Sequence, residues 1–186
     1  MQIRSGTQHD LELLREIDGT IESTQYLHLE HSGEGLGKLF RLEERPLREK
    51  LIESNRLDDV AFFVARQILT GADEGTVLVA EHEDAVVASL IAQPRPSRGT
   101  IHIVDLRVDY DYRRQGLGTA LVFQMIQQAR DAALRAVSME TLTNNLPASA
   151  LLDKCGFALS GIDIRRRSNH DIVKESATLF WYAALD

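Results

Sequence analysis

The sequence lacks the features that place a protein in a membrane, in an oxidising compartment or on a nucleic acid. It has one cysteine among 186 residues, so no internal disulfide can form, which is typical of a reducing compartment. It has no run of about 18 apolar residues, and residues 1–5 lack the apolar segment of a signal peptide. Its net charge of -7 is opposite in sign to what binding of a phosphate backbone requires. We therefore expect a cytoplasmic protein with no nucleic-acid partner and no membrane partner.

The single cysteine and one pair of histidines could still carry chemistry. Cys155 could act as a nucleophile, but a lone cysteine is more often a small buried hydrophobe. His28 and His31 lie three residues apart without a third ligand, which is more typical of a polar face of a helix or strand than of a metal site. We therefore expect no metal.

What the sequence does have is the composition of an ordinary globular domain. Hydrophobic residues make up 44% and charged residues 26% of the chain, close to the averages for such proteins. A chain of 186 residues can build one sizeable core but would leave two domains small, so residues 1–186 are predicted to form a single domain. The acidic balance favours a cationic substrate such as an amine, although moderate negative charge also serves solubility alone.

Hydrophobic periodicity predicts a chain in which helices and strands are mixed. Helices are expected at residues 10–17, 58–70 and 117–133, and from Asn145 and Pro147 to just before Gly156. Strands are expected at residues 2–4, 77–82, 86–93, 100–108, 136–140, 159–164 and 177–185. Asp84 and Ala85 are predicted to form a two-residue turn, whereas residues 20–44 give a mixed pattern. The order predicts an α/β (α+β) fold.

One loop stands out between the strand at 100–108 and the helix at 117–133. It reads Arg113-Arg114-Gln115-Gly116-Leu117-Gly118. The first N–H groups of a helix have no intrahelical partner and lie at the positive end of its dipole, so they bind phosphate oxygens well. Gly116 and Gly118 allow the backbone to approach a pyrophosphate. The glycines could also form only a turn, with Arg113 and Arg114 as solvated charges.

Two other phosphate-binding motifs fit this loop poorly. A dinucleotide-binding fold would place an acidic residue about 20 residues beyond the loop, where Glu140 lies, but its third glycine would fall on Leu121. The phosphate loop of nucleoside triphosphatases requires Gly-Lys-Ser/Thr, which is absent from the sequence.

The loop resembles the Q/R-x-x-G-x-G/A signature of the GNAT family of N-acetyltransferases. The flanking Leu106-Arg107-Val108 and Asp111-Tyr112-Arg113 are also similar to that family, as are Asn145-Leu146-Pro147-Ala148 and Lys154-Cys155-Gly156-Phe157, which resemble its second motif. The resemblance covers residues 77–157. The Cys-Gly-Phe sequence and the tail at 177–182 are similar to the branch that contains the streptothricin acetyltransferases.

The resemblance implies a fold and a cofactor. The fold would be a mostly antiparallel central sheet of about six to seven strands flanked by helices, with a splay between the fourth and fifth strands, at 101–108 and 136–140. Acetyl-CoA would insert into this splay as the co-substrate. The residues implied to bind it are Leu106, Arg107, Val108, Arg113, Arg114, Gln115, Gly116, Leu117, Gly118, Thr119 and Asn145.

The resemblance also suggests which residues could take part in catalysis. Glu140 and Asp105 are the candidates for deprotonating the amine, although either could be an ordinary charge at a strand end. The tyrosine that the family often uses as general acid falls on Leu152, which cannot donate a proton. Either Tyr182 or Tyr110 replaces it, or the thiolate leaves without help.

The implied activity is acetyl transfer to a primary amine of a small cationic molecule, by direct attack in a ternary complex. Residues 20–56 and the last hairpin would shape the acceptor pocket. Acetylation of a protein lysine or N-terminus, and a non-catalytic acyl-CoA-binding module, are the alternatives. The apolar residues 179–182 need a cover, which could be a second copy in a homodimer or a helix of the same chain.

Overall fold

The computed structural model describes residues 1–185 and divides the chain into two compact units. One unit holds residues 1–20, 54–139 and the chain end from 182, and the other holds residues 21–53 and 140–181. None of the helices within residues 1–185 is long and apolar enough to cross a membrane. The single domain stays a prediction.

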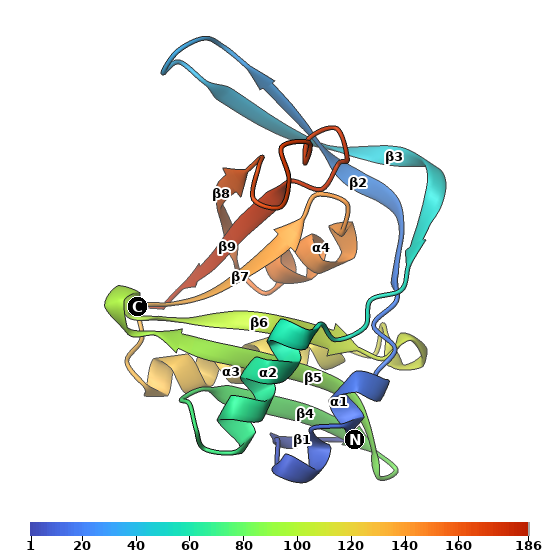
Figure 1. The fold of residues 1–186 in the computed structure, drawn as a ribbon, viewed down its shortest axis with the longest axis vertical. Coiled ribbons are helices and arrows are strands. Elements are labelled where there is room, and N and C mark those ends of the chain that lie inside the picture. The colour runs from blue at the N-terminus through green and yellow to red at the C-terminus, as the bar shows by residue number, and fades with distance from the viewer. Residues whose placement is uncertain (186) are drawn as a thin grey trace. The chain divides into compact units, whose positions relative to one another are not determined.

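The first unit contains a meander of strands followed by a long helix (Figure 1). Its elements are β1 (Gln2–Ser5), η1 (Gln8–Asp10), α1 (Leu13–Glu16), α2 (Asp59–Leu69), β4 (Thr76–His82), β5 (Ala85–Arg95), η2 (Pro96–Arg98), β6 (Thr100–Val108), η3 (Tyr110–Tyr112) and α3 (Leu117–Asp131). The second unit contains β2 (Ile21–Ser32), β3 (Leu39–Glu53), α4 (Leu146–Lys154) and β8 (Ala158–Asp163). Two strands, β7 (Ala136–Leu142) and β9 (Thr178–Ala184), have residues in both units.

The main sheet has seven strands in the order β1-β4-β5-β6-β7-β9-β8. The pairs β1/β4, β4/β5 and β5/β6 are antiparallel, and β6/β7 is parallel. The expected mixed, mostly antiparallel sheet with six to seven strands is therefore confirmed. The parallel register runs from Thr100 opposite Ala136 to Ile103 opposite Met139, whereas β6 continues to Val108. The splay beyond this register stays a prediction.

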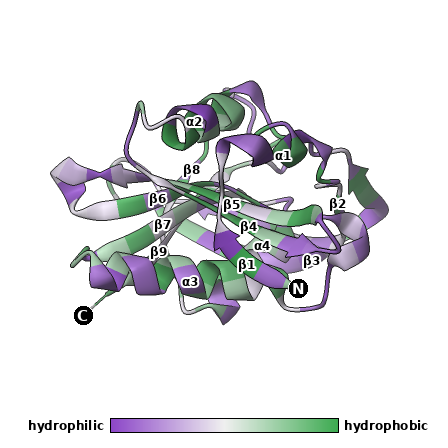
Figure 2. Ribbon diagram, turned by 90° about the horizontal axis from the view of Figure 1, so that it is seen from below, coloured by the Kyte–Doolittle hydropathy of each residue, from purple (hydrophilic) through white to green (hydrophobic). Residues whose placement is uncertain are grey.

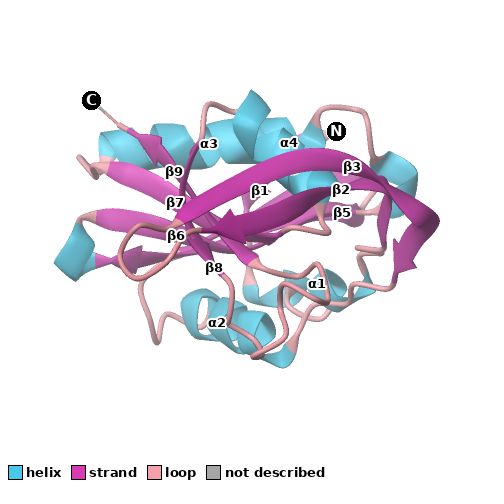
Figure 3. Ribbon diagram, turned by 90° about the horizontal axis from the view of Figure 1, so that it is seen from above, coloured by secondary structure: helices cyan, strands magenta, loops and turns pink. Residues whose placement is uncertain are grey.

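The core of the first unit lies on both faces of β4, β5 and β6. Figures 2 and 3 show α1 and α2 on one side of these strands and α3 on the other. On the α1 and α2 side, Leu14 and Ala65 pack with Val79 and Ile91, all fully buried. Strand residues alternate between faces, so one run of apolar residues in each strand can serve both helical layers. On the α3 side, the helix buries Leu121, Val122 and Met125.

The turn between β4 and β5 consists of Glu83 and Asp84, one residue earlier than predicted. Both residues have positive φ, 49° and 65°, as a type I′ hairpin turn requires at its two central positions. Ala85 is already the first residue of β5. The prediction of Asp84 and Ala85 was wrong because the turn uses no Asn-Gly or Asp-Gly pair to mark its position.

The region with the mixed pattern forms a long hairpin, which the sequence did not predict as a whole. Strands β2 and β3 lie side by side in Figure 3, and they pair from Ile21 opposite Glu53 to Ser32 opposite Leu39. The register shifts at Ser23, close to Pro46, a residue that cannot donate to a strand ladder. Within the same unit, the Leu27 N–H donates to the Thr143 carbonyl oxygen at 2.8 Å.

The final strands are neighbours in the sheet, as predicted for a hairpin. Leu179 is fully buried and Trp181 is 6% exposed, and the Trp181 Nε1–H donates to Thr141 Oγ1 at 2.9 Å. These two side chains are therefore covered within the chain. The homodimer stays a prediction, but Leu179 and Trp181 no longer support it.

Candidate active site

The candidate site begins where β6 ends. The Asp109 N–H donates to the Val87 carbonyl oxygen at 2.9 Å, and the Asp109 side chain caps η3 by accepting from the Asp111 N–H. The Arg113 Nε–H donates to the Val108 carbonyl oxygen at 3.1 Å. The loop therefore leaves the sheet along a path fixed by hydrogen bonds to β5 and β6.

The loop then enters α3 through a left-handed residue. Gly116 is the N-cap of α3 with φ of 84°, and Arg114 also has positive φ, 62°. Backbone in this region forms concavities that bind anions. The first intrahelical bond runs from the Ala120 N–H to the Gly116 carbonyl oxygen at 2.9 Å, so the N–H groups of residues 117–119 have no partner in the helix.

The backbone of Gly116 is exposed, with free space beside its Cα. A Cβ placed on Gly116 would meet no heavy atom within 4 Å. Leu117 and Gly118 are buried and anchor the helix, while Arg114 and Gln115 are exposed. With 15 residues, α3 is long enough to carry a full helix dipole. Unpaired N–H groups, an exposed arginine and free space together fit a pyrophosphate group.

The two carboxylates predicted for catalysis are both paired with arginine, but in different surroundings. Asp105 accepts from Arg107 Nε at 2.8 Å and from Nη2 at 2.7 Å, and the two side chains are 15% and 2% exposed. Glu140 accepts from Arg166 Nε at 2.9 Å and from Nη2 at 2.7 Å, with exposed fractions of 31% and 45%. Breaking a buried pair costs about 3–5 kcal/mol, whereas an exposed pair contributes about 0–1 kcal/mol. Separating the Glu140 carboxylate from its arginine therefore costs much less free energy than separating the Asp105 carboxylate from its arginine.

The Arg107 side chain is committed within the protein. Besides Asp105, it donates from Nη1 to the Asn55 carbonyl oxygen at 3.0 Å. The predicted contribution of Arg107 to cofactor binding can therefore come only from its backbone, which lies with Leu106 and Val108 in β6 beyond the stretch paired with β7.

The second motif provides a helix cap and a core residue. Asn145 is the N-cap of α4, and its Oδ1 accepts from the Ala148 N–H at 3.3 Å. A role of Asn145 in cofactor binding stays a prediction. Leu152, at the position of the family's tyrosine, is 1% exposed. Of the two substitutes, Tyr110 is 43% exposed under the Arg113 guanidinium, and Tyr182 is half-buried in β9.

The sequence did not single out a polar cluster in the second unit. Tyr26 Oη lies 3.1 Å from His28 Nδ1. Burial raises the pKa of Tyr26, and a hydrogen bond with Glu175 raises it further. His28 is a polar residue of a strand, as expected, and residues 1–185 contain no group of three or more His, Cys, Asp or Glu side chains that could hold a metal ion. The sequence signal for this cluster was the spacing of two residues between Tyr26 and His28, which places both side chains on the same face of a strand.

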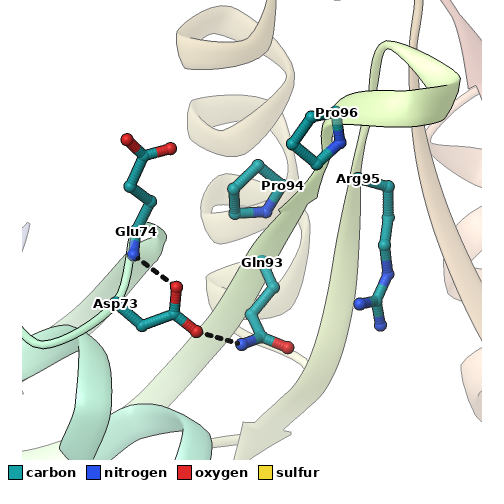
Figure 4. Close-up of a pocket in the computed structure, with 6 residues that line it drawn as sticks. All are labelled: Asp73, Glu74, Gln93, Pro94, Arg95 and Pro96. Carbon is teal, nitrogen blue, oxygen red and sulfur yellow. Dashed lines mark hydrogen bonds between the residues drawn. The ribbon is translucent and has the colours of Figure 1, made fainter.

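A small depression occurs at the other end of β5 (Figure 4). It has a volume of about 210 Å³ and is lined by Asp73, Glu74, Gln93, Pro94, Arg95 and Pro96. Arg95 pairs with Thr100 at the start of β6, whereas Ala88 pairs with Val108 at its end. Seven strand residues span roughly 20 Å, so this depression is separate from the glycine loop.

Comparison with known proteins identifies the family. The sequence model of the acetyltransferase (GNAT) family matches residues 36–157. The streptothricin acetyltransferase of Escherichia coli is 35% identical over 81 residues, which are 44% of this chain and 45% of that protein. N-acetyltransferase 8 of Homo sapiens is 36% identical over 87 residues, 45% of this chain and 38% of that protein. The match thus spans less than half the length of these relatives.

Solved structures show the same fold along the whole chain. A nourseothricin acetyltransferase aligns with a TM-score of 0.79 at 20% identity, covering 100% of this chain and 98% of its own. A Bacillus anthracis protein described as a streptothricin acetyltransferase, solved with acetyl coenzyme A, also has a TM-score of 0.79 at 20% identity and covers 100% and 97%. The family model covers more than half of the 186 residues. The chain therefore belongs to the acetyltransferase (GNAT) family.

Proposed function

We propose that the chain is an acetyl-CoA-dependent N-acetyltransferase that acts on a primary amine of a small cationic molecule. The observation that carries the proposal is the start of α3, where Gly116 caps the helix at φ of 84° and a Cβ on it would meet no heavy atom within 4 Å. A helix N-terminus of this kind attracts the pyrophosphate of CoA. The exposed Arg114 adds positive charge beside it.

The end of β6 is the proposed place for the pantetheine arm and the thioester. Leu106 and Val108 lie beyond the register that β6 shares with β7, so their backbone groups can pair with an extended partner. A backbone N–H near Val108 would stabilise the charge that develops on the thioester oxygen. The amine nitrogen then forms the C–N bond, the C–S bond breaks, and CoA leaves as the thiolate.

A cationic acceptor must lose a proton before it can attack. Glu140 is the better candidate for this step because its partner Arg166 is exposed and contributes little to holding it. Asp105 is held by a buried guanidinium, which suits a structural role. For the departing thiolate, Tyr182 and Tyr110 remain the proposed donors, or the thiolate leaves unaided.

The small cationic acceptor is supported by the acidic chain, with a net charge of -7, and by the partial identity to streptothricin acetyltransferases. A protein acceptor is the second candidate, because a ribosomal-protein-S18-alanine N-acetyltransferase from Escherichia coli has the same fold with a TM-score of 0.65. A non-catalytic acyl-CoA-binding module is the third.

Turnover on a panel of acceptors separates these candidates. The purified chain is mixed with acetyl-CoA and streptothricin, a polyamine, a lysine peptide or a peptide with a free N-terminus, and CoA release is followed. Acetylation of a small amine with the highest kcat/KM supports the proposal. Preference for a peptide replaces it with protein acetylation, and binding of acetyl-CoA without any turnover points to a non-catalytic module.

A further inference from the structure

Two segments of the chain that are far apart in sequence meet beside the end of β6. The Asp18 carbonyl oxygen accepts from the Tyr110 N–H at 2.9 Å, and the Asp18 N–H donates to Asp109 Oδ2 at 3.0 Å. The carbonyl oxygen of Asn55 accepts from Arg107 Nη1 at 3.0 Å. Residues 18–20 lead into the β2–β3 hairpin, and residues 54–56 lead out of it. We call these two segments the hairpin roots.

The roots are packed closely against each other and against Arg107. A Cβ built on Gly19 would lie 2.5 Å from the Asn55 carbonyl oxygen and 3.1 Å from Arg107 Nη1. Real Cβ atoms do not approach backbone that closely, so only glycine fits here without displacing the other root. The contact between the two roots therefore depends on the Arg107 side chain and on the absence of a side chain at Gly19.

The Arg107 guanidinium is held in place from the opposite side by Asp105. Its Nε and Nη2 are used by the carboxylate and its Nη1 by the Asn55 carbonyl oxygen, with the side chain 2% exposed. Ser89, a small residue, is the partner of Arg107 across the β5/β6 ladder. A buried ion pair often adds little to the stability of a protein, because both charges lose their hydration. We therefore explain the pair of Asp105 and Arg107 by its effect on the position of the guanidinium.

We propose that Arg107, oriented by Asp105, is a positioning residue that fastens both hairpin roots to the end of β6. This strand also carries the backbone of Leu106 and Val108, which is proposed to receive the cofactor. The inference rests on the proposed function in one respect: residues 20–56 are expected to shape the acceptor pocket. Loosening the roots then weakens acceptor recognition while the pyrophosphate site at α3 keeps its geometry.

Two variants of the full chain test this inference from opposite sides. Arg107→Met removes the guanidinium, whereas Gly19→Ala keeps both charged side chains of the ion pair and crowds the Asn55 carbonyl oxygen and Arg107 Nη1. The matched controls are Arg4→Met, which breaks an ion pair with Asp10 and Glu81 elsewhere in the same unit, and Gly37→Ala, where the nearest atom to an added Cβ is 3.6 Å away.

The first readout is hydrogen exchange of the Asp18 and Tyr110 amides. We expect exchange at least about tenfold faster in Arg107→Met and Gly19→Ala than in the wild type, with no such local change in the controls. The second readout is a rise of about tenfold or more in the KM for the acceptor amine, with little change in kcat or in the affinity for CoA. Arg107→Lys, which keeps the charge but not the forked geometry, should recover part of both effects.

Each outcome decides one of the claims. If the controls loosen the same amides, or if neither test variant does, Arg107 does not fasten the roots. If the amides loosen but the KM for the acceptor stays the same, the positioning role is overturned. If the wild type acetylates no amine, the proposed function falls, and hydrogen exchange alone still decides whether Arg107 fastens the roots.

Discussion

Arg113 and Val108 are joined by a hydrogen bond of 3.1 Å from the arginine Nε to the valine carbonyl oxygen, which ties the glycine loop to the last residue of β6. The Arg113 side chain is half-buried and its guanidinium also lies over the Tyr110 ring. Arg114, the next residue, is exposed. The two adjacent arginines therefore differ: Arg113 holds the loop to β6, whereas Arg114 is exposed, and its contact with the pyrophosphate stays a prediction.

Reversing the charge of Arg114 should weaken CoA binding without unfolding the protein. We expect Arg114→Glu to bind CoA about tenfold more weakly, because the change places a negative charge beside the pyrophosphate. At a CoA concentration of 100 times the wild-type Kd, the stabilisation should fall from about 2.7 to about 1.4 kcal/mol. Thermal unfolding with and without CoA measures this difference.

The control for this prediction lies on the same helix. Arg130 is exposed in the last turn of α3, far from its N-terminus, so Arg130→Glu should keep the full CoA-dependent stabilisation. If Arg114→Glu is stabilised by CoA as much as the wild type is, the start of α3 is not the pyrophosphate site.

A second prediction concerns the loss of folding stability at low pH. Asp10 accepts from Arg4 and from Thr7, and the hydrogen bond from Arg4 is the main reason why its pKa falls from 3.8 to about 2. A depressed carboxylate pKa stabilises the fold above pH 3.8, and this contribution is lost as the pH falls towards 2. The shift corresponds to about 2 kcal/mol.

Urea unfolding at several pH values checks this contribution. Between pH 5 and pH 2 the wild type should lose about 2 kcal/mol more of its free energy of unfolding than Asp10→Asn does. Asp59→Asn is the matched control, because Asp59 is 98% exposed in its pair with Arg15. If the wild type and Asp10→Asn lose the same free energy of unfolding between pH 5 and pH 2, Asp10 is not the cause of the loss.

Much of the first unit could be predicted from sequence because its signals are local. The strand at 100–108 has the bounds that were expected. Gly116 lies where the loop ends and the helix begins, and glycine readily adopts the left-handed φ that this position has. In the second unit, Asn145 and Pro147 marked the start of α4 through capping, which also depends on neighbours in sequence.

The parts that were missed depend on partners far along the chain. Arg107 meets Asn55, which is 52 residues away, and no periodicity indicates such a contact. The β2–β3 hairpin has exposed residues along most of β3, so its alternation of polar and apolar residues is weak. The pairing of Glu140 with Arg166 likewise spans 26 residues. Tertiary structure, not local preference, decides each of these.

A third prediction compares two buried serines. Among residues 1–185, Ser89 has a buried hydroxyl with no hydrogen-bond partner, whereas Ser138 Oγ lies 3.0 Å from His102 Nδ1. Ser89→Ala should be neutral or slightly stabilising, because it removes an unsatisfied polar atom. Ser138→Ala should cost about 1–3 kcal/mol, because it removes the partner of a polar atom that is partly buried. Urea denaturation of the two variants gives both values, and equal losses would contradict the assignment of Ser89 as unsatisfied.

The last prediction separates the two carboxylates. Glu140→Gln should lower kcat by at least about tenfold at neutral pH, since a general base usually contributes about 10²–10⁴-fold. The loss should shrink at high pH, where more of the acceptor amine is already neutral. CoA affinity should stay the same, because the proposed pyrophosphate site at α3 does not include Glu140.

Asp105→Asn is the comparison, since it weakens the buried pair with Arg107 and should raise the KM for the acceptor more than it lowers kcat. A wild-type kcat and pH profile in Glu140→Gln, together with a large loss of kcat in Asp105→Asn, would exchange the two roles. Full kcat in both variants would mean that water and backbone groups alone remove the proton.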